Sequence, residues 1–591
     1  MKLNRKFKLP VCKKVGSFLL YRFVQNLLFS GMIYDSVTAK RYRKESKNGG
    51  EIVKDLREQI VAYEPENDVE QQYKEEILRQ WDCTGDEIFE RPDEGHFTAS
   101  SIILNPAMDK MLMVYHNIYQ SMGWTGGHAD GAQNLLQKAM DEAKEETGIQ
   151  EVYPLCSEIL SLDILPVHSH KKRGRLVSAH RHYNVTYGLI APEKQKLTIK
   201  PDENSEVRWV SLDEWKPLCS EPHMIPVYEK IIERMKQKRQ EKTGLYSYLA
   251  DVLLPWFADN ARDLPWRKDK EPYHIWLSEI MLQQTRVEAV KGYYHRFLEK
   301  LPDIKALAEA PEDELLKLWE GLGYYSRVRN LQKAAQVIME QHNGVFPSDY
   351  DKILALPGIG DYTAGAIASI CFDKPTPAVD GNVLRVISRI TEDFQNILAP
   401  AMKKRIADNL RRVYPAGEKA YTFNQSLMEL GATICVPNGA PKCEICPMNQ
   451  WCMACKNGTW TVLPQKETKK KRRIEYKTVF VLQCNGNTAV QKRPANGLLA
   501  SLWQYPNVEG TLDTQAALNQ AQEWGVKPVS VDKVLPGKHI FSHVEWHMTC
   551  YYLQCENQSD LFVWADENAM NTQIALPTAF RIFRETEESS L

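Results

Sequence analysis

The alternation of apolar and polar residues divides the chain into three folded blocks. From about residue 50 to 238, short β-rich runs such as TASSIIL (98–104) and HYNVTYGLI (182–190) alternate with helical patterns. From about 245 to 460 the apolar residues recur with the 3.6-residue period of helices, and Pro and Gly mark the turns. TVFVLQC (478–484) opens a third block that again mixes strands and helices. The pattern predicts a multidomain fold in which an all-α domain separates two α/β domains.

Charged segments separate these blocks. KQKRQEK (236–242) predicts a linker before the helical block, and the basic segment 463–475 predicts a second one after it. We therefore expect a basic extension at 1–49 and domains at 50–240, 245–462 and 476–591. A chain of 591 residues has room for three or four domains.

Charge and cysteine content narrow the class of protein. The net charge is −1, yet residues 1–50 contain twelve Lys or Arg and two Asp or Glu. Their one apolar run, Val15 to Tyr34, is interrupted by Arg22, Gln25 and Asn26, which favours a basic, partly helical extension over a membrane span or signal peptide. The odd total of thirteen cysteines, five of them between positions 435 and 455, argues against a secreted disulfide framework and for a reducing cytoplasm.

An acidic helix is predicted within GHADGAQNLLQKAMDEAKEETGI (127–149). Glu142, Glu145 and Glu146 fall on one helical face, where three like charges repel unless a cation lies among them. Carboxylates in this number suit Mg²⁺ bound to substrate phosphates. The alternative is a solvated acidic face.

The same stretch resembles the Nudix box, the loop–helix–loop that holds metal in hydrolases of nucleoside diphosphate-linked compounds. Two positions depart from the box: Gln133 replaces its first Glu, and Asp141 replaces its Arg. The resemblance implies a Nudix fold and leaves hydrolase activity open. The matching residues are Gly127, Glu142, Glu145, Glu146, Gly148 and Ile149.

The helical block, from Leu254 to Cys452, closely resembles the adenine DNA glycosylases of the MutY type, in the helix-hairpin-helix superfamily. Six motifs occur in the family's order, where one alone would be weak. They are LPWR (264–267), SEIMLQQTR (278–286), GLGYYSRVRNL (321–331), LPGIGDYTAG (356–365), VDGNVLRV (379–386) and MELGA (428–432).

Two carboxylates in these motifs fit the cleavage of a glycosidic bond, which uses one acid and one nucleophile or electrostatic partner. Glu279 lies in an apolar helix, IWLSEIML, where burial would raise its pKa. Asp380 precedes a helix start, where a carboxylate stays ionised. The resemblance implies that Glu279 protonates adenine and that Asp380, with Asn382 in the same motif, stabilises or attacks the cationic sugar.

Tyr362 indicates which reaction follows base release. In relatives that also cut the DNA backbone, a lysine occupies the position of Tyr362 and forms a Schiff base with the sugar. A phenol cannot form one. The resemblance therefore implies a monofunctional glycosylase that leaves an abasic site. We expect Tyr362 to bond Asp380 or to pack beside the sugar cation.

Further residues of the motifs are implied to contact DNA, from which the adenine must be extruded. Gln284 and Tyr324 would wedge into the base stack, with Thr285 and Leu322 beside them in their motifs. The alternative for Tyr324 and Trp266 is core packing. Trp266, Arg267 and Glu429 would line the adenine pocket, and the backbone of Gly358 and Gly360 would grip a phosphate.

The cysteines Cys435, Cys443, Cys446 and Cys452 have the spacing C-x7-C-x2-C-x5-C. Four thiolates this close can hold zinc or a [4Fe–4S] cluster. The resemblance favours the cluster, because the family has C-x6-C-x2-C-x5-C directly after the MELGA-like helix. Cys455 is a fifth thiol that could compete as a ligand.

The third block resembles the C-terminal Nudix-like domain with which MutY-type enzymes recognise 8-oxoguanine opposite the adenine. The matching segments are GLLASLWQYPNVEG (497–510) and Phe541-Ser542-His543. The helix expected at 513–525 has no cluster of Glu, so this domain is expected to bind and not to hydrolyse. Ser542 and His543 would contact the lesion, with Phe541 packed beneath them.

Base excision of adenine opposite 8-oxoguanine or guanine, by a monomer acting on cellular DNA in the cytoplasm, is therefore the function we expect. One alternative is an Mg²⁺-dependent pyrophosphohydrolase that the helical block tethers to DNA. Another is a related glycosylase for a different lesion. A further hypothesis is that the first domain destroys 8-oxo-dGTP while the rest repairs its consequences.

Overall fold

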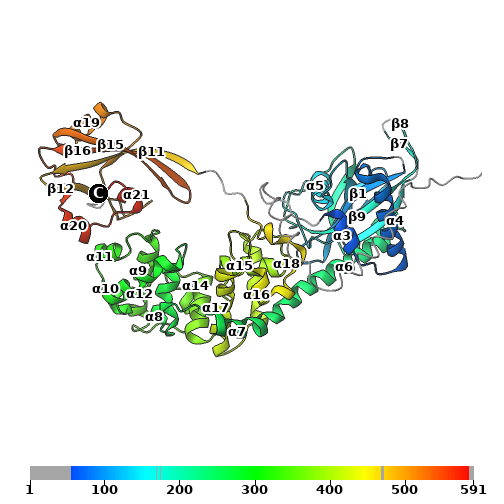
Figure 1. The fold of residues 1–591 in the computed structure, drawn as a ribbon, viewed down its shortest axis with the longest axis horizontal. Coiled ribbons are helices and arrows are strands. Elements are labelled where there is room, and N and C mark those ends of the chain that lie inside the picture. Colours follow the sequence, from blue (N-terminus) through cyan, green and yellow to red (C-terminus); the bar gives the residue numbers. More distant parts are fainter. Residues whose placement is uncertain (1–54, 93, 168, 173–174, 468–471, 585–591) are drawn as a thin grey trace, which may run out of the picture. The chain divides into compact units, whose positions relative to one another are not determined.

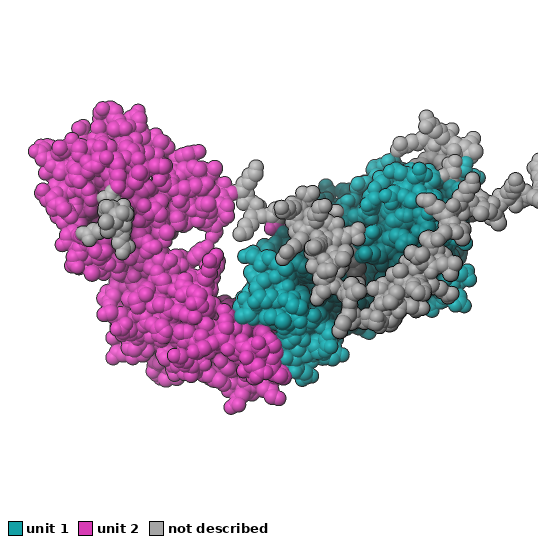
Figure 2. Space-filling model, viewed as in Figure 1, with its two compact units in different colours: residues 1–253, 381–409, 430–466 teal, residues 254–380, 410–429, 467–591 magenta. Residues whose placement is uncertain are grey.

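The computed structural model describes residues 55–92, 94–167, 169–172, 175–467 and 472–584. The expected extension at 1–49, with its apolar run, lies outside these residues. The chain forms two compact units, one of residues 1–253, 381–409 and 430–466, the other of residues 254–380, 410–429 and 467–591 (Figure 2). No helix among the described residues is long and apolar enough to cross a membrane.

The N-terminal domain is built on a mixed sheet with strand order β10-β2-β1-β9-β5. The central strands β1 and β9 (Figure 1) run parallel. Strands β2, β4 and β6 pair antiparallel with one or other of them. A separate ribbon pairs β7 with β8. The strands are β1 (Gly95–Leu104), β2 (Lys110–His116), β3 (Ser121–Gly123), β4 (Thr125–His128), β5 (Tyr153–Pro154), β6 (Ser161–Val167), β7 (His170–Lys172), β8 (Arg175–Val177), β9 (His180–Ile190) and β10 (Asn204–Ser211).

Helix α5 (Leu135–Thr147) is the acidic helix that the sequence predicts. The side chain of Asn134 caps its first turn, and Gly148 ends it with a φ of 75°, a left-handed conformation that glycine adopts at low cost. Leu135 and Ala139 on its apolar face pack into the core formed with strand β1. The other helices of this domain are α3 (Leu56–Ala62), α4 (Asp68–Thr84) and α6 (Ile225–Gly244).

The linker expected at 236–242 is wrong, because these residues form the last turns of α6. Lys242 is only 7% exposed. Its ammonium group donates hydrogen bonds to the carbonyl oxygens of Leu155, at 2.5 Å, and Glu392, at 2.7 Å. The buried carboxylate of Glu392 in turn accepts a hydrogen bond from Ser157 at 2.7 Å. Lys242, a residue of the expected linker, thus holds the N-terminal domain to the segment after α15 (Gly381–Ile390).

The central part of the chain is helical, as its 3.6-residue period predicts. Helix α8 is buried on almost every side and packs against α9, α12 and α14. The helices are α7 (Tyr248–Asn260), α8 (Pro272–Leu282), α9 (Val287–Lys300), α10 (Ile304–Glu309), α11 (Glu312–Leu318), α12 (Ser326–Gln341), α13 (Tyr350–Leu354), α14 (Asp361–Phe372), α15 (Gly381–Ile390), α16 (Pro400–Val413), α17 (Glu418–Thr433) and α18 (Met453–Asn457).

The C-terminal domain repeats the strand pattern of the first one. Its parallel centre is β11 with β16, and β12, β14 and β15 pair antiparallel with one or other of them. Strand β11 begins at Arg473, so the expected linker ends earlier than residue 475. The elements are β11 (Arg473–Cys484), β12 (Asn487–Lys492), β13 (Trp503–Gln504), β14 (Asn507–Glu509), α19 (Thr514–Glu523), β15 (Pro528–Ile540), β16 (Val544–Cys555), β17 (Val563–Ala565), α20 (Glu567–Thr572) and α21 (Thr578–Arg581).

Candidate active site

Helix α8 carries Glu279 into the interior, as its apolar sequence predicts. The side chain is 5% exposed, and burial raises the pKa of its carboxyl group to about 7. Tyr362, at the start of α14, donates a hydrogen bond of 2.6 Å to Oε2 of Glu279. That bond and the charge of Arg267 lower the pKa, while the charge of Asp380 raises it. A carboxyl group with a pKa near neutrality can hold a proton and also release it.

Asp380 directly precedes helix α15, at the position that the sequence predicts, and is half-buried. Its negative charge raises the pKa of both Glu279 and Tyr362. The hydroxyl of Tyr362 bonds Glu279, whereas the sequence led us to expect Asp380 or the sugar as its neighbour. The next motif residue, Asn382, accepts a hydrogen bond of 2.9 Å from Arg385.

Arg267 and Glu429, both expected in the adenine pocket, lie together in a buried ion pair. The carboxylate of Glu429 is fully buried and accepts hydrogen bonds from Arg267, at 2.8 Å, and Arg262, at 2.6 Å. Arg267 also donates to Gln425 at 3.0 Å. These contacts hold the segment before α8 against α17. Glu429 would therefore influence the expected adenine pocket indirectly, through the two arginines that it binds.

Replacing Glu429 by Ala is expected to destabilise the helical domain by about 3–5 kcal/mol, because it leaves the guanidinium of Arg267 buried without its carboxylate. The measurement is the urea midpoint of unfolding, followed by tryptophan fluorescence. Glu444, which is exposed, provides the control as Glu444→Ala. Equal midpoints for the two variants would show that the ion pair adds no stability.

Gln284 and Tyr324 occupy strained turns. Both have positive φ angles, 58° and 47°, which non-glycine residues adopt mainly where the surroundings enforce them. Tyr324 is 50% exposed, although Trp319 nearby in sequence is fully buried. An exposed aromatic ring on a strained turn fits a residue that meets a ligand better than one that packs in a core.

Arg327 holds these two turns together and was not singled out from the sequence. Its guanidinium donates to the carbonyl oxygens of Met281 and Gln283, at 3.1 and 2.6 Å, and to those of Leu322 and Gly323, at 3.0 and 3.1 Å. Burial lowers its pKa to about 10. The last carbonyl oxygens of α8, which ends at Leu282, have no partner within the helix and need donors from elsewhere. The predicted end of this helix was therefore the signal that could have pointed to Arg327.

The remaining predicted residues of the helical domain divide between core and surface. Trp266 and Leu322 belong to the hydrophobic core, and the ring of Trp266 packs edge-on against Tyr294. Gly358, with a φ of 76°, forms the turn before α14, where a Cβ atom would lie 2.6 Å from Cβ of Asn330. Gly360 caps α14, beside the free N–H groups of its first turn. Thr285 follows Gln284 in the turn after α8 and is half-buried.

The segment Phe541-Ser542-His543 forms the turn between β15 and β16. Phe541 packs edge-on against Trp546, while Ser542 and His543 are exposed. Phe541 is thus less exposed than its two neighbours. The hydroxyl of Ser542 lies 3.4 Å from that of Tyr324.

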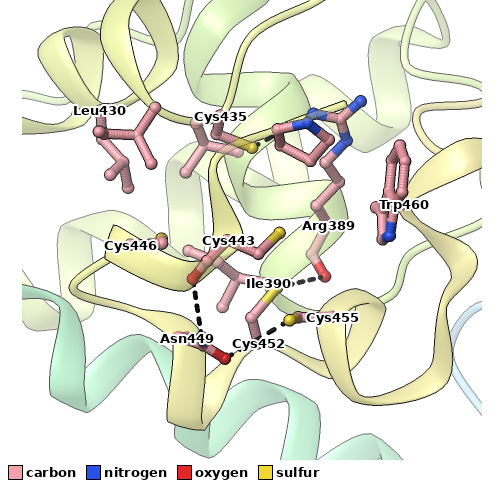
Figure 3. Close-up of a pocket in the computed structure, with 13 residues that line it drawn as sticks. Arg389, Ile390, Leu430, Cys435, Cys443, Cys446, Asn449, Cys452, Cys455 and Trp460 are labelled. Carbon is pink, nitrogen blue, oxygen red and sulfur yellow. Dashed lines mark hydrogen bonds between the residues drawn. The ribbon is translucent and has the colours of Figure 1, made fainter. Parts of the chain in front are cut away.

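Five cysteines line one pocket, together with Arg389 and Trp460 (Figure 3). Arg389 donates a hydrogen bond of 3.4 Å to Sγ of Cys435. Burial and the neighbouring thiols raise the pKa of Cys443 to about 12 and of Cys446 to about 11. Sγ of Cys455 donates to Oδ1 of Asn449 at 3.4 Å. The donor set suits a thiophilic metal or cluster, because several thiolates would repel one another without a cation.

Two of the three glutamates of α5 pair with lysines, and the third is buried. Glu142 pairs with Lys138 at 2.8 Å, and Glu145 with Lys200 at 3.3 Å. Glu146 is buried, accepts from the N–H of Gly126 at 3.0 Å, and has its pKa raised to about 8 by burial. The charge repulsion that suggested a cation is thus partly relieved by ammonium groups and by protonation of Glu146.

Two family models match the chain. Residues 277–411 match the HhH-GPD superfamily base excision DNA repair proteins, and residues 478–586 match the NUDIX domain. The Nudix match thus lies at the C-terminal end, in the domain expected to recognise the opposite base.

Several characterised relatives are named adenine DNA glycosylase. The protein of Rattus norvegicus is 33% identical in an alignment of length 429, which covers 59% of this chain and 83% of the relative. That of Buchnera aphidicola subsp. Schizaphis graminum is 33% identical over 334 residues, or 54% and 92% of the two chains. That of Mus musculus is 35% identical over 394 residues, or 54% and 75%. Because about a third of the residues are shared over three quarters or more of each relative, this chain belongs to the adenine DNA glycosylases, enzymes of base excision repair that hydrolyse N-glycosyl bonds.

Proposed function

We propose that the substrate is adenine mispaired with 8-oxoguanine or guanine in double-stranded DNA, and that the product is an abasic site. The observation that carries the proposal is the buried carboxyl group of Glu279, whose pKa of about 7 keeps a proton available at neutral pH. Breaking an N-glycosidic bond requires a proton on the base and stabilisation of positive charge on the sugar. A protonated acid and a nearby carboxylate supply both.

In this mechanism Glu279 donates its proton to a ring nitrogen of the extruded adenine. As the N-glycosidic bond breaks, the bonding electron pair stays with the base. The ionised Asp380 then stabilises the oxocarbenium ion of the sugar or attacks it. Water then completes the hydrolysis at the sugar. Asn382 belongs to the same motif and holds Arg385, so we assign it a positioning role.

Tyr362 makes the enzyme monofunctional, because a phenol cannot form the Schiff base through which a lysine cuts the backbone. Its hydrogen bond to Glu279 stabilises the charged carboxylate and so lowers the pKa.

The variant Tyr362→Phe is therefore expected to raise the pKa of Glu279 and move the alkaline limb of the pH–rate profile upward. The acid form then persists to higher pH. Single-turnover base release between pH 5.5 and 9 measures the shift. Tyr350→Phe, at a half-buried tyrosine of α13, serves as the control. A midpoint that stays in place would contradict the role of this hydrogen bond.

DNA contacts follow from the exposed turns. Gln284 and Tyr324 enter the base stack from their strained turns, and the N–H groups near Gly358 and Gly360 bind a backbone phosphate at the start of α14. Arg327 positions both wedge residues. Trp266 is buried in the hydrophobic core and shapes the wall of the adenine pocket from there.

The C-terminal domain reads the base opposite the adenine. Ser542 and His543 offer exposed hydrogen-bonding groups on the β15–β16 turn, and Phe541 supports them. In the described part of this domain, α19 carries a single Glu, at position 523, so the helix lacks the carboxylate cluster of a Nudix box.

Single-turnover adenine release from duplexes with A opposite 8-oxoguanine, G or T tests the proposal. Release is expected to be fastest opposite 8-oxoguanine and slowest opposite T, with strand cleavage only after alkali. The double variant Ser542→Ala, His543→Ala is expected to lose the preference for 8-oxoguanine while still acting on A opposite G. No release from any duplex by folded protein, or equal rates on all three, would overturn it.

We further propose that Cys435, Cys443, Cys446 and Cys452 bind a [4Fe–4S] cluster, and that Cys455 is not a ligand. When bound, the cluster would supply a cationic core that cross-links the loop for DNA docking. Arg389 beside Cys435 would offset the negative charge of the thiolates.

Cys452→Ser is expected to lose iron, whereas Cys455→Ser keeps four iron atoms and four sulfides per chain. The reason is that Cys452 occupies the fourth position of the family spacing, while Cys455 bonds Asn449. Iron and sulfide analysis of both purified variants measures this. The reverse pattern would make Cys455 the fourth ligand.

For the N-terminal domain we propose a Nudix-like fold. The support is that its strand pairing repeats that of the C-terminal domain, which the NUDIX model matches. A pocket of about 430 Å³ is lined by Glu142, Glu145 and Glu146, which would hold Mg²⁺ if the domain hydrolyses nucleotides such as 8-oxo-dGTP. Mg²⁺-dependent phosphate release from a nucleotide panel, lost in Glu142→Gln, tests this second activity. No release from any nucleotide would dismiss it.

A further inference from the structure

We propose that His96, His128, His180 and His182 of the N-terminal domain form a binding site for one divalent transition-metal ion, best fitted by zinc. This site is separate from the cysteine pocket and from the glutamates of α5. Of the four, only His128 lies within the stretch that resembles the Nudix box, and it is not one of the residues that match the box.

The sheet register brings the four histidines to one face. His96 on β1 is paired directly with His182 on the parallel strand β9. His180 lies two residues before His182, so it points to the same side. His128 on β4 is paired with Thr98, which lies two residues after His96 and shares its face. Three strands thus present four imidazoles at one place.

The geometry suits a single ion. One ring nitrogen from each histidine can be chosen so that all four lie within 4.8 Å of one another. Nε2 of His180 lies 3.2 Å from Nε2 of His182. Tetrahedral zinc with Zn–N bonds of 2.0–2.1 Å places its ligand nitrogens about 3.4 Å apart, so small side-chain rotations complete the shell.

The rings gather closely around a common point. The centroid of the His96 ring lies 5.0 Å from those of His128, His180 and His182. His182 lies 5.1 Å from both His128 and His180. Four imidazoles this close cannot all be protonated, and neutral imidazole is the form that binds metal.

Burial leaves His96 in need of a partner. Its side chain is 3% exposed, and neither ring nitrogen has a hydrogen bond of normal geometry among the described residues. A buried polar group without a hydrogen-bond partner destabilises the fold, and a metal bond would offset that cost.

The ion would serve as a structural clamp at one end of the pocket. His128 and His182 line that pocket, and nearby Asp130 is held by Arg91 through hydrogen bonds of 2.7 and 2.9 Å. Four protein ligands close the tetrahedral shell, which is the pattern of structural zinc. The clamp would join β1, β4 and β9, which contribute Thr98, Gly126 and Asn184 to the lining of the pocket.

Zinc titration of the full-length, tag-free chain with its iron in place tests the proposal. Wild type is expected to bind one zinc ion per chain, and His182→Asn and His128→Asn to weaken binding by more than about 100-fold, since loss of even outer-shell partners costs 10–100-fold. His223→Asn, at an exposed histidine lining the same pocket, should bind like wild type. Equal affinity in all variants would overturn the proposal.

X-ray absorption at the zinc edge of wild type decides the matter even if a variant fails to fold. Scattering from four nitrogens at about 2.0 Å is expected for the histidine site. Sulfur at about 2.3 Å would place the ion at the cysteines instead and refute the histidine site. No bound zinc in the wild-type chain would refute it equally.

Discussion

Glu279→Gln is expected to lower the single-turnover rate of adenine release by about 10²–10⁴-fold, the usual contribution of a general acid. Glutamine keeps the size of the side chain and can still accept the hydrogen bond of Tyr362, but it has no acidic proton for the base. Burial in α8 makes the loss specific, because no bulk solvent reaches the carboxyl group to substitute for it. The loss should therefore appear in the rate of the chemical step and not in DNA binding.

The pH dependence of the wild type gives a second check on Glu279. In the proposed mechanism the protonated carboxyl group is the active form, and burial raises its pKa to about 7. The rate should therefore be highest below pH 7 and fall as the pH rises through this value. Glu299→Gln, at an exposed position of α9, should follow the wild-type profile. A Glu279→Gln variant within tenfold of wild type would remove Glu279 from the mechanism.

Asp380→Asn is expected to slow adenine release by about 10²–10³-fold, the range seen when one preorganised electrostatic contact with the transition state is removed. The amide keeps the shape of the side chain but loses the negative charge that stabilises the sugar cation in the proposed mechanism. Single-turnover rates on A opposite 8-oxoguanine measure the loss. Asp351→Asn, at an exposed residue of α13, is the control.

The same substitution has an effect on Glu279 that a merely structural role would not produce. The charge of Asp380 raises the pKa of Glu279, so its removal should lower that pKa. The residual activity of Asp380→Asn should then fall at a lower pH than that of wild type. An unchanged midpoint would mean that the two carboxyl groups do not sense each other during the reaction.

The sequence alone predicted much of the helical domain. Apolar periodicity indicated its helices, and the apolar neighbours of Glu279 indicated burial and a raised pKa. These features are local, because the spacing of residues along the chain determines which side chains share one face of a helix. Residues 236–242 show the limit of local patterns: their charges suggested a linker, but α6 continues through them because Lys242 finds buried carbonyl oxygens.

The tertiary structure decided which groups meet. Tyr362 lies 83 positions from Glu279, and Arg327 lies 44 positions from Gln283, whose carbonyl oxygen it binds. The histidine cluster depends on the register between β1, β4 and β9, which pairs His96 with His182 across 86 positions. Spacing along the chain fixes the face on which a residue lies, whereas strand register and helix packing fix its partners, because these depend on contacts between distant segments.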